Sequence, residues 1–142
     1  MATITPDEGL EWFVERALDE SSASDERAYS IAVGSGTASL SSTDTQLDTE
    51  EYRGEDPDSN VTIRNTSSIG DIECKITISG GTEVPAGTEI TELGVFARDP
   101  SISEGNVTES DDTLVYRELR PAITLASGDR KTFAFTISVL NN

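Results

Sequence analysis

The sequence predicts a mainly β protein, an antiparallel β-sandwich or jelly-roll-like domain with an N-terminal amphipathic helix. The first observation is the strict alternation of apolar and polar residues over 132–140, which places every second side chain on one buried face. The second is the same alternation over 72–78. The third is a series of Gly- and Pro-containing turns that separate short strand-like segments. The alternating apolar residues are Ile72, Cys74, Ile76, Ile78, Phe133, Phe135, Ile137 and Val139.

The chain has 142 residues, the size of one domain. We expect residues 1–20 to form a helical assembly or packing segment and residues 28–142 to form a single β domain. A short polar linker, rich in serine, lies between them.

The N-terminal segment has a strong helix start, with Thr5 as N-cap and Pro6 at the first helical position. Apolar residues then recur at helical spacing and form a stripe, while Trp12 lies beside that stripe. This stripe is the candidate interface between copies, although it is equally suited to pack against the chain's own sheet. The candidate interface residues are Leu10, Trp12, Phe13, Val14 and Ala17.

The strand-like segments follow in order. A first strand at 29–33 ends at a glycine pair, and residues 37–59 are predicted to be a polar surface loop with one helical turn near 44–47. Arg120 and Pro121 are expected to divide two short strands, because proline cannot donate to a ladder. The remaining predicted strands are 61–65, 72–78, 89–97, 113–118, 122–125 and the final segment 132–140.

The chain is very acidic, with 27 Asp and Glu, 10 Lys and Arg, and a net charge of −17. We expect no binding to nucleic acid, because phosphate affinity is supplied by clustered basic side chains. The favoured interpretation is a halophilic host, since molar salt shortens the Debye length to about 3 Å and screens the repulsion between acids. A less favoured alternative is an acidic protein that mimics nucleic acid.

The composition also argues against catalysis. There is no histidine to act as a general base, and the single cysteine, Cys74, alternates with isoleucines as a core residue does. We therefore expect no enzyme activity and no bound cofactor.

One segment has a weak pattern for a cation site. Asp56, Asp58 and Asn60 supply oxygen ligands at alternate positions, as calcium loops do. Val61 and Ser67 then replace the glycine and glutamate that such a loop requires. A solvated acidic loop is the favoured interpretation, with calcium or another cation as the alternative.

No stretch approaches the roughly twenty apolar residues of a membrane span, and the first residues lack the features of a signal peptide. We expect a protein made in the host cytoplasm that makes no contact with membranes.

Five segments together resemble small structural proteins of tailed viruses and proviruses, related to tail-fibre and tail-collar modules and including haloarchaeal forms. The resemblance implies a virion protein without catalytic residues, located on the tail, fibre or baseplate, or on the capsid surface as a decoration or turret. It also implies assembly into a homo-oligomer, expected to be a trimer, with other virion proteins as further partners. A receptor- or carbohydrate-binding β-module on the particle surface is the alternative. The segments are 31–37 (IAVGSGT), 44–53 (DTQLDTEEYR), 90–96 (ITELGVF), 114–117 (LVYR) and 127–129 (SGD).

Overall fold

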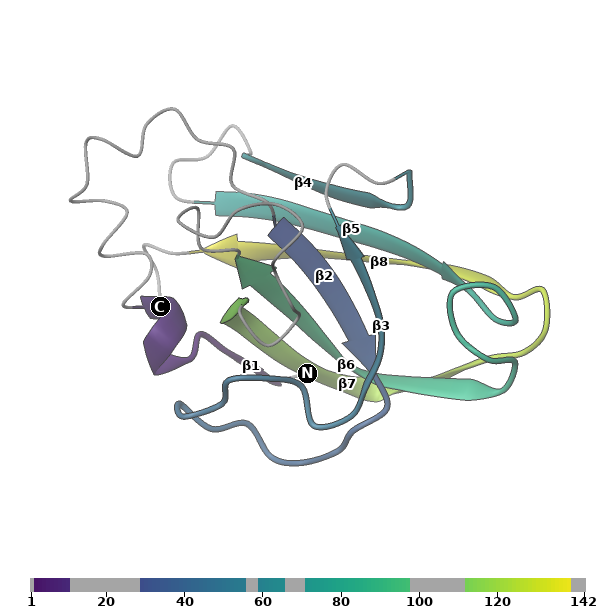
Figure 1. Ribbon diagram of the computed structural model, residues 1–142, viewed down its shortest axis with the longest axis horizontal. Helices are drawn as coiled ribbons and strands as arrows, with labels where there is room; N and C mark the ends of the chain where they lie inside the picture. The colour runs from purple at the N-terminus through teal and green to yellow at the C-terminus, as the bar shows by residue number, and fades with distance from the viewer. Residues whose placement is uncertain (1, 11–28, 56–58, 66–70, 98–111, 139–142) are drawn as a thin grey trace.

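The computed structural model describes residues 2–10, 29–55, 59–65, 71–97 and 112–138. This part of the chain is mainly β, and all pairings between its strands are antiparallel (Figure 1). The predicted β class and the antiparallel pairing are therefore confirmed. The strands are β1 (Ala2–Ile4), β2 (Tyr29–Gly34), β3 (Glu50–Glu55), β4 (Val61–Asn65), β5 (Asp71–Ser79), β6 (Thr88–Ala97), β7 (Thr113–Leu125) and β8 (Arg130–Ser138).

The strands form two sheets. A five-stranded sheet has the order β1-β7-β6-β2-β3, and a three-stranded sheet has the order β4-β5-β8. Figure 1 shows β8 running beside β5, with β4 on the other side of β5. The turn at 126–129 carries the chain from β7 in the five-stranded sheet to β8 in the three-stranded one.

The main core contains side chains from both sheets. The alternation that marks 72–78 and 132–137 places one face of β5 and β8 in this core, together with side chains of β2, β6 and β7. Cys74 is fully buried here, which confirms its prediction as a core residue. The main core includes Ile31, Val33, Val61, Cys74, Ile76, Ile78, Ile90, Leu93, Val95, Val115, Tyr116, Leu125, Phe133, Phe135 and Ile137.

The five-stranded sheet also buries residues on its other face. Ala32 of β2, Phe96 of β6 and Leu114 of β7 form a second apolar cluster with Leu47, which comes from the segment between β2 and β3. A side chain at Gly94 would meet Leu47 Cδ2 at 2.7 Å, so the absence of a Cβ there lets Leu47 lie close to the sheet. The segment 35–49 thus covers this face.

Two features of the predicted loop 37–59 were wrong. Residues 50–55 form β3, paired with β2, although their sequence EEYRGE has no apolar alternation. The exposed edge of β2 supplies the hydrogen-bonding partner that this segment needs. No helical turn occurs near 44–47, because Asp44 instead closes a turn by donating from its backbone N to Ser41 O.

The predicted break at Arg120 and Pro121 was also wrong, since β7 is continuous from 113 to 125. Pairing between β6 and β7 shifts in register between Ile90 and Glu92, and these residues face Ile123 and Leu119. Pro121 therefore lies where the ladder is irregular, which is a position that tolerates a missing N–H.

At the N-terminus, a strand that was not predicted, β1, pairs with β7. A helical turn follows at 7–10, where Leu10 N donates to Pro6 O. A Cβ at Gly9 would lie 2.7 Å from Val115 Cα, so this turn packs closely on β7. The rest of the predicted helix lies outside the described residues.

Candidate functional site

The best-organised polar site of the described residues lies where the segment 35–49 meets the five-stranded sheet. Glu92 of β6 is fully buried there. Its Oε1 accepts hydrogen bonds from Gly36 N (3.2 Å) and Thr49 N (2.8 Å), and its Oε2 accepts one from Asp48 N (3.1 Å). One carboxylate thereby holds both ends of the segment on the sheet.

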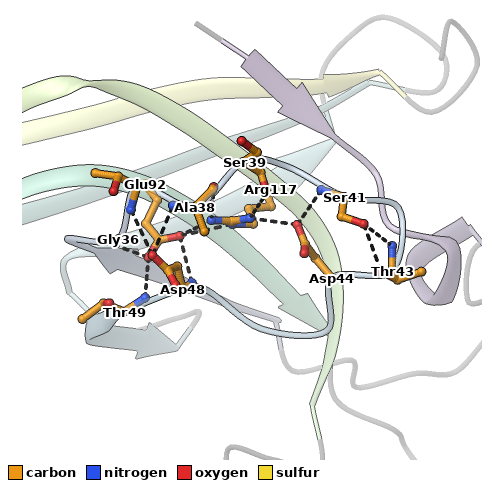
Figure 2. A network of polar contacts seen from close by, with 11 residues as sticks. Gly36, Ala38, Ser39, Ser41, Thr43, Asp44, Asp48, Thr49, Glu92 and Arg117 are labelled. Atoms are coloured by element: carbon orange, nitrogen blue, oxygen red, sulfur yellow. Dashed lines mark hydrogen bonds and ion pairs between the residues drawn. The ribbon is translucent and has the colours of Figure 1, made fainter.

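Arg117 of β7 neutralises this buried carboxylate. Its Nε and Nη2 donate to Glu92 Oε2 at 3.1 and 2.9 Å, and its Nη1 donates to Asp44 Oδ2 at 2.8 Å. Nη2 also reaches Ala38 O at 3.0 Å. Figure 2 shows these groups converging from the sheet and the loop. Burial alone lowers the pKa of Arg117, but the hydrogen bonds to Asp44 and Glu92 outweigh it, so its pKa is raised and the side chain stays charged.

Two aspartates shape the loop itself. Asp48 Oδ2 accepts from Thr37 N (3.0 Å) and Ala38 N (3.2 Å), and Asp44 Oδ2 accepts from Ser41 N (2.9 Å). Such bonds from a carboxylate to nearby backbone N–H groups stabilise turns. The acids of this loop therefore fix its conformation.

The chemistry of this cluster is structural. Glu92 accepts five N–H groups, counting those of the loop and of Arg117. Two of these donors reach Oε1 and three reach Oε2, so both oxygens of the carboxylate are engaged in holding the loop and Arg117. The cluster holds the loop in place.

A pocket of about 470 Å³ opens beside this cluster. Arg53 of β3 lies over the ring of Phe96, with its Cζ 3.6 Å from the ring centroid. Its Nη1 and Nη2 pair with Asp112 (2.8 Å) and Glu50 (2.6 Å). The acids outnumber this one base, so the pocket repels anions. The lining residues are Glu8, Thr45, Gln46, Leu47, Asp48, Glu50, Arg53, Phe96 and Asp112.

A second buried carboxylate lies within the main core. Glu118 of β7 is fully buried, and it accepts hydrogen bonds from Tyr116 Oη (2.9 Å) and from Arg120 Nε. The ring of Tyr116 stacks on Phe135 of β8, with 5.2 Å between centroids. Burial, with the charge of Glu118 adding to it, raises the pKa of Tyr116. The polar contacts of Glu118 lie within β7, while the stacking of Tyr116 on Phe135 connects β7 with β8.

The predicted interface stripe is described only at its first residue. Leu10 is 42% exposed. Trp12, Phe13, Val14 and Ala17 lie outside the described residues. The interface therefore stays a prediction.

The predicted cation ligands are described only at Asn60. Its Nδ2 donates to Tyr52 Oη (3.1 Å) and Thr77 O (3.3 Å), which ties the amide to the fold. Asp56 and Asp58 lie outside the described residues. Within the described ranges, no group of three or more His, Cys, Asp and Glu side chains is arranged to hold a metal ion.

Sequence reasoning missed the cluster around Glu92 and Arg117. The signal was present, because Glu92 stands inside the largely apolar run 90–97 and Arg117 directly follows the apolar residues 114–116. A charge in such a run is rarely buried without a partner.

Comparison with known protein families, curated proteins and solved structures finds no match for this chain. In the described part of the chain, no helix has the length and apolar character needed to cross a membrane.

Proposed function

We propose that the protein is a structural component of a tailed virus particle of a halophilic archaeon, acting by oligomeric assembly. Its position is on the tail, fibre or baseplate, or on the capsid surface as a decoration or turret. One observation supports the proposal most: the buried ion pair of Glu92 and Arg117 fixes the segment 35–49 on the five-stranded sheet. A building block needs a fixed surface shape, and this cluster provides one.

The fold belongs to the same proposal. We propose that the two sheets form a β-sandwich or jelly-roll-like domain, in which each sheet covers one side of the main core. Support comes from the core itself, which combines residues of β5 and β8 with residues of β2, β6 and β7. Sheets that share an interior in this way pack face to face.

The acidic composition supports a salt-loving host. A net charge of −17 on 142 residues destabilises a compact chain in dilute buffer through repulsion, and molar salt removes most of that cost.

The alternative of a carbohydrate-binding module is less well supported. Sugar-binding surfaces use exposed aromatic rings, but Phe96 beside the pocket is 1% exposed and covered by Arg53. The pocket therefore offers no free face of this ring for a sugar to stack on.

The test is quantitative mass spectrometry of particles purified from the culture that produces the protein. Many copies per particle, in constant ratio to the major capsid protein through a density gradient, are expected. An abundant cytoplasmic host protein serves as the control for contamination. Absence of the protein from particles would refute the proposal, and its recovery with a host DNA-binding protein would favour the nucleic-acid mimic.

A further inference from the structure

The three-stranded sheet has an outer face that differs in charge from the rest of the chain. Its residues alternate with the core residues of β4, β5 and β8, so they point away from the main core. We name this surface the basic face. It consists of Thr62, Arg64, Glu73, Lys75, Thr77, Ser79, Arg130, Thr132, Ala134 and Thr136.

Asp71, at the first position of β5, lies on the same side of the sheet, and the residues of the basic face hold three of the ten bases of the chain and one further acid. That acid, Glu73, is paired with both Lys75 and Arg64, at 3.0 Å each. The hydrogen bond from Lys75, followed by that from Arg64, lowers the pKa of Glu73, which keeps it ionised within the pairing. With Asp71 included, this side of the sheet carries three bases and two acids, a net charge of +1 on a protein whose net charge is −17.

The remaining side chains of the basic face are small. Thr77 and Thr132 form a hydroxyl–hydroxyl hydrogen bond of 2.9 Å across β5 and β8. The pairings of β4 with β5 and of β5 with β8 run without a register shift. Short side chains on an uninterrupted ladder give an even surface that a second protein can approach closely.

The opposite side of the molecule is acidic. The face of the five-stranded sheet that turns away from the main core is covered by the segment 35–49 and bordered by the edge strand β3. Asp48, Glu51 and Glu55 are exposed there. We name these three residues the acidic surface. The basic face and the acidic surface thus lie on opposite sides of the main core.

We propose that the basic face binds the acidic surface of a second copy of this chain, so that copies associate head to tail. This inference rests on the proposed role in assembly and names the surfaces that perform it. Two basic faces placed against each other would oppose like charges, which is unfavourable. A head-to-tail contact is heterologous, and it produces a ring when the rotation between copies closes and a filament when it does not.

Salt determines when this contact forms. At low ionic strength, with a Debye length of about 10 Å, two copies of net charge −17 repel each other before their surfaces meet. In molar salt the Debye length falls to about 3 Å, so the long-range repulsion disappears while ion pairs that become buried in the contact are screened much less. Assembly is therefore expected in molar KCl.

The first experiment compares the only two lysines of the chain by sedimentation in molar KCl. Lys75→Glu reverses a charge within the basic face and is expected to weaken self-association by about tenfold or more. Lys131→Glu makes the same change of net charge at an exposed residue that is outside the basic face and pairs with Ile78. It is expected to leave association within about twofold of wild type. Circular dichroism confirms that both variants are folded.

The second experiment tests the pairing of the two surfaces. Arg64→Gln/Lys75→Gln neutralises two bases of the basic face, and Glu51→Gln/Glu55→Gln neutralises two acids of the acidic surface, so each variant alone is expected to be monomeric. Mixed, they retain one intact basic face and one intact acidic surface, and are expected to form a species of two chains that grows no further.

Three results would overturn the inference. If Lys75→Glu associates as wild type does, another surface makes the contact, while the proposed virion role stands as long as particles contain the protein. If the mixed variants stay monomeric, the two surfaces do not pair. If the wild-type chain is monomeric in molar KCl, both the contact and the self-assembly in the proposed function fail.

Discussion

Glu92 and Arg117 form a buried ion pair between neighbouring strands, with 2.9 Å between Oε2 and Nη2. Their side chains are 0% and 2% exposed. The pair is embedded in the loop that it holds, because Glu92 also accepts from three backbone N–H groups of 36–49. Loss of either charge therefore affects the loop as well as the pair.

We expect Arg117→Leu to lower the free energy of unfolding by about 3–5 kcal/mol, because it leaves the charge of Glu92 buried without its cation. Urea denaturation in molar KCl measures the change. Asp44→Asn is the control, since Asp44 is partly exposed and its substitution leaves Glu92 paired. It is expected to cost about 1 kcal/mol. If Arg117→Leu costs less than about 1 kcal/mol, water or the loop must stabilise the charge of Glu92 in place of Arg117.

The double variant Glu92→Leu/Arg117→Leu tests whether the ion pair also stabilises the loop, in addition to balancing its own two buried charges. Buried ion pairs are often replaced by apolar residues with no net loss of stability. Here the replacement leaves the N–H groups of Gly36, Asp48 and Thr49 without their acceptor, so we expect the variant to remain at least about 2 kcal/mol less stable than wild type. Stability equal to wild type would mean that the loop finds other acceptors. The same urea titration gives the comparison.

The outcome of the sequence predictions has a physical explanation. Strands with one buried face, such as β5 and β8, are marked by alternation, and their bounds follow within one or two residues. β3 and β1 have no such mark, because their place depends on the free edges of β2 and β7. Glu92 is recognisable as an unusual charge in an apolar run, but its partners come from segments that only the topology brings together.

Two glycines between β5 and β6 are needed for different reasons: Gly80 for close packing and Gly87 for a positive φ. A side chain at Gly80 would clash with the backbone carbonyl oxygens of Leu125 and Ala126, whereas Gly87 has φ = 90° and open space around it. Asparagine tolerates positive φ. We therefore expect Gly87→Asn to cost less than about 1 kcal/mol and Gly80→Asn about 3 kcal/mol or more. Thermal unfolding compares them, and equal losses would contradict the packing at Gly80.

Tyr116 should make the fold sensitive to alkali. Burial, with the nearby charge of Glu118, raises its pKa in the folded state above that of the unfolded chain. The folded state therefore keeps this proton when the unfolded state loses it. The stabilisation that comes from this raised pKa is complete below about pH 10. Above that pH, the free energy of unfolding should fall by about 1.4 kcal/mol per pH unit until the pKa of Tyr116 in the folded state is reached.

Tyr116→Phe removes this titration and one hydrogen bond to Glu118. We expect it to be about 1–3 kcal/mol less stable than wild type at neutral pH, with the difference narrowing above about pH 10. Urea denaturation across that pH range gives both quantities. A constant difference at all pH values would show that Tyr116 does not titrate differently in the two states.

Salt should stabilise the protein, and the effect should depend on where a charge lies. The chain has a net charge of −17, and the repulsion among its acids weakens as the Debye length falls from about 10 Å to about 3 Å between 0.1 M and 1 M salt. We expect the melting temperature to rise with KCl over this range. The variant Asp7→Asn/Glu89→Gln, which removes two exposed acids, should rise less steeply. The cost of Arg117→Leu should change little with salt, because buried pairs are poorly screened. A melting temperature that stays flat across the range would remove the halophilic interpretation and leave the acids to be explained by a partner.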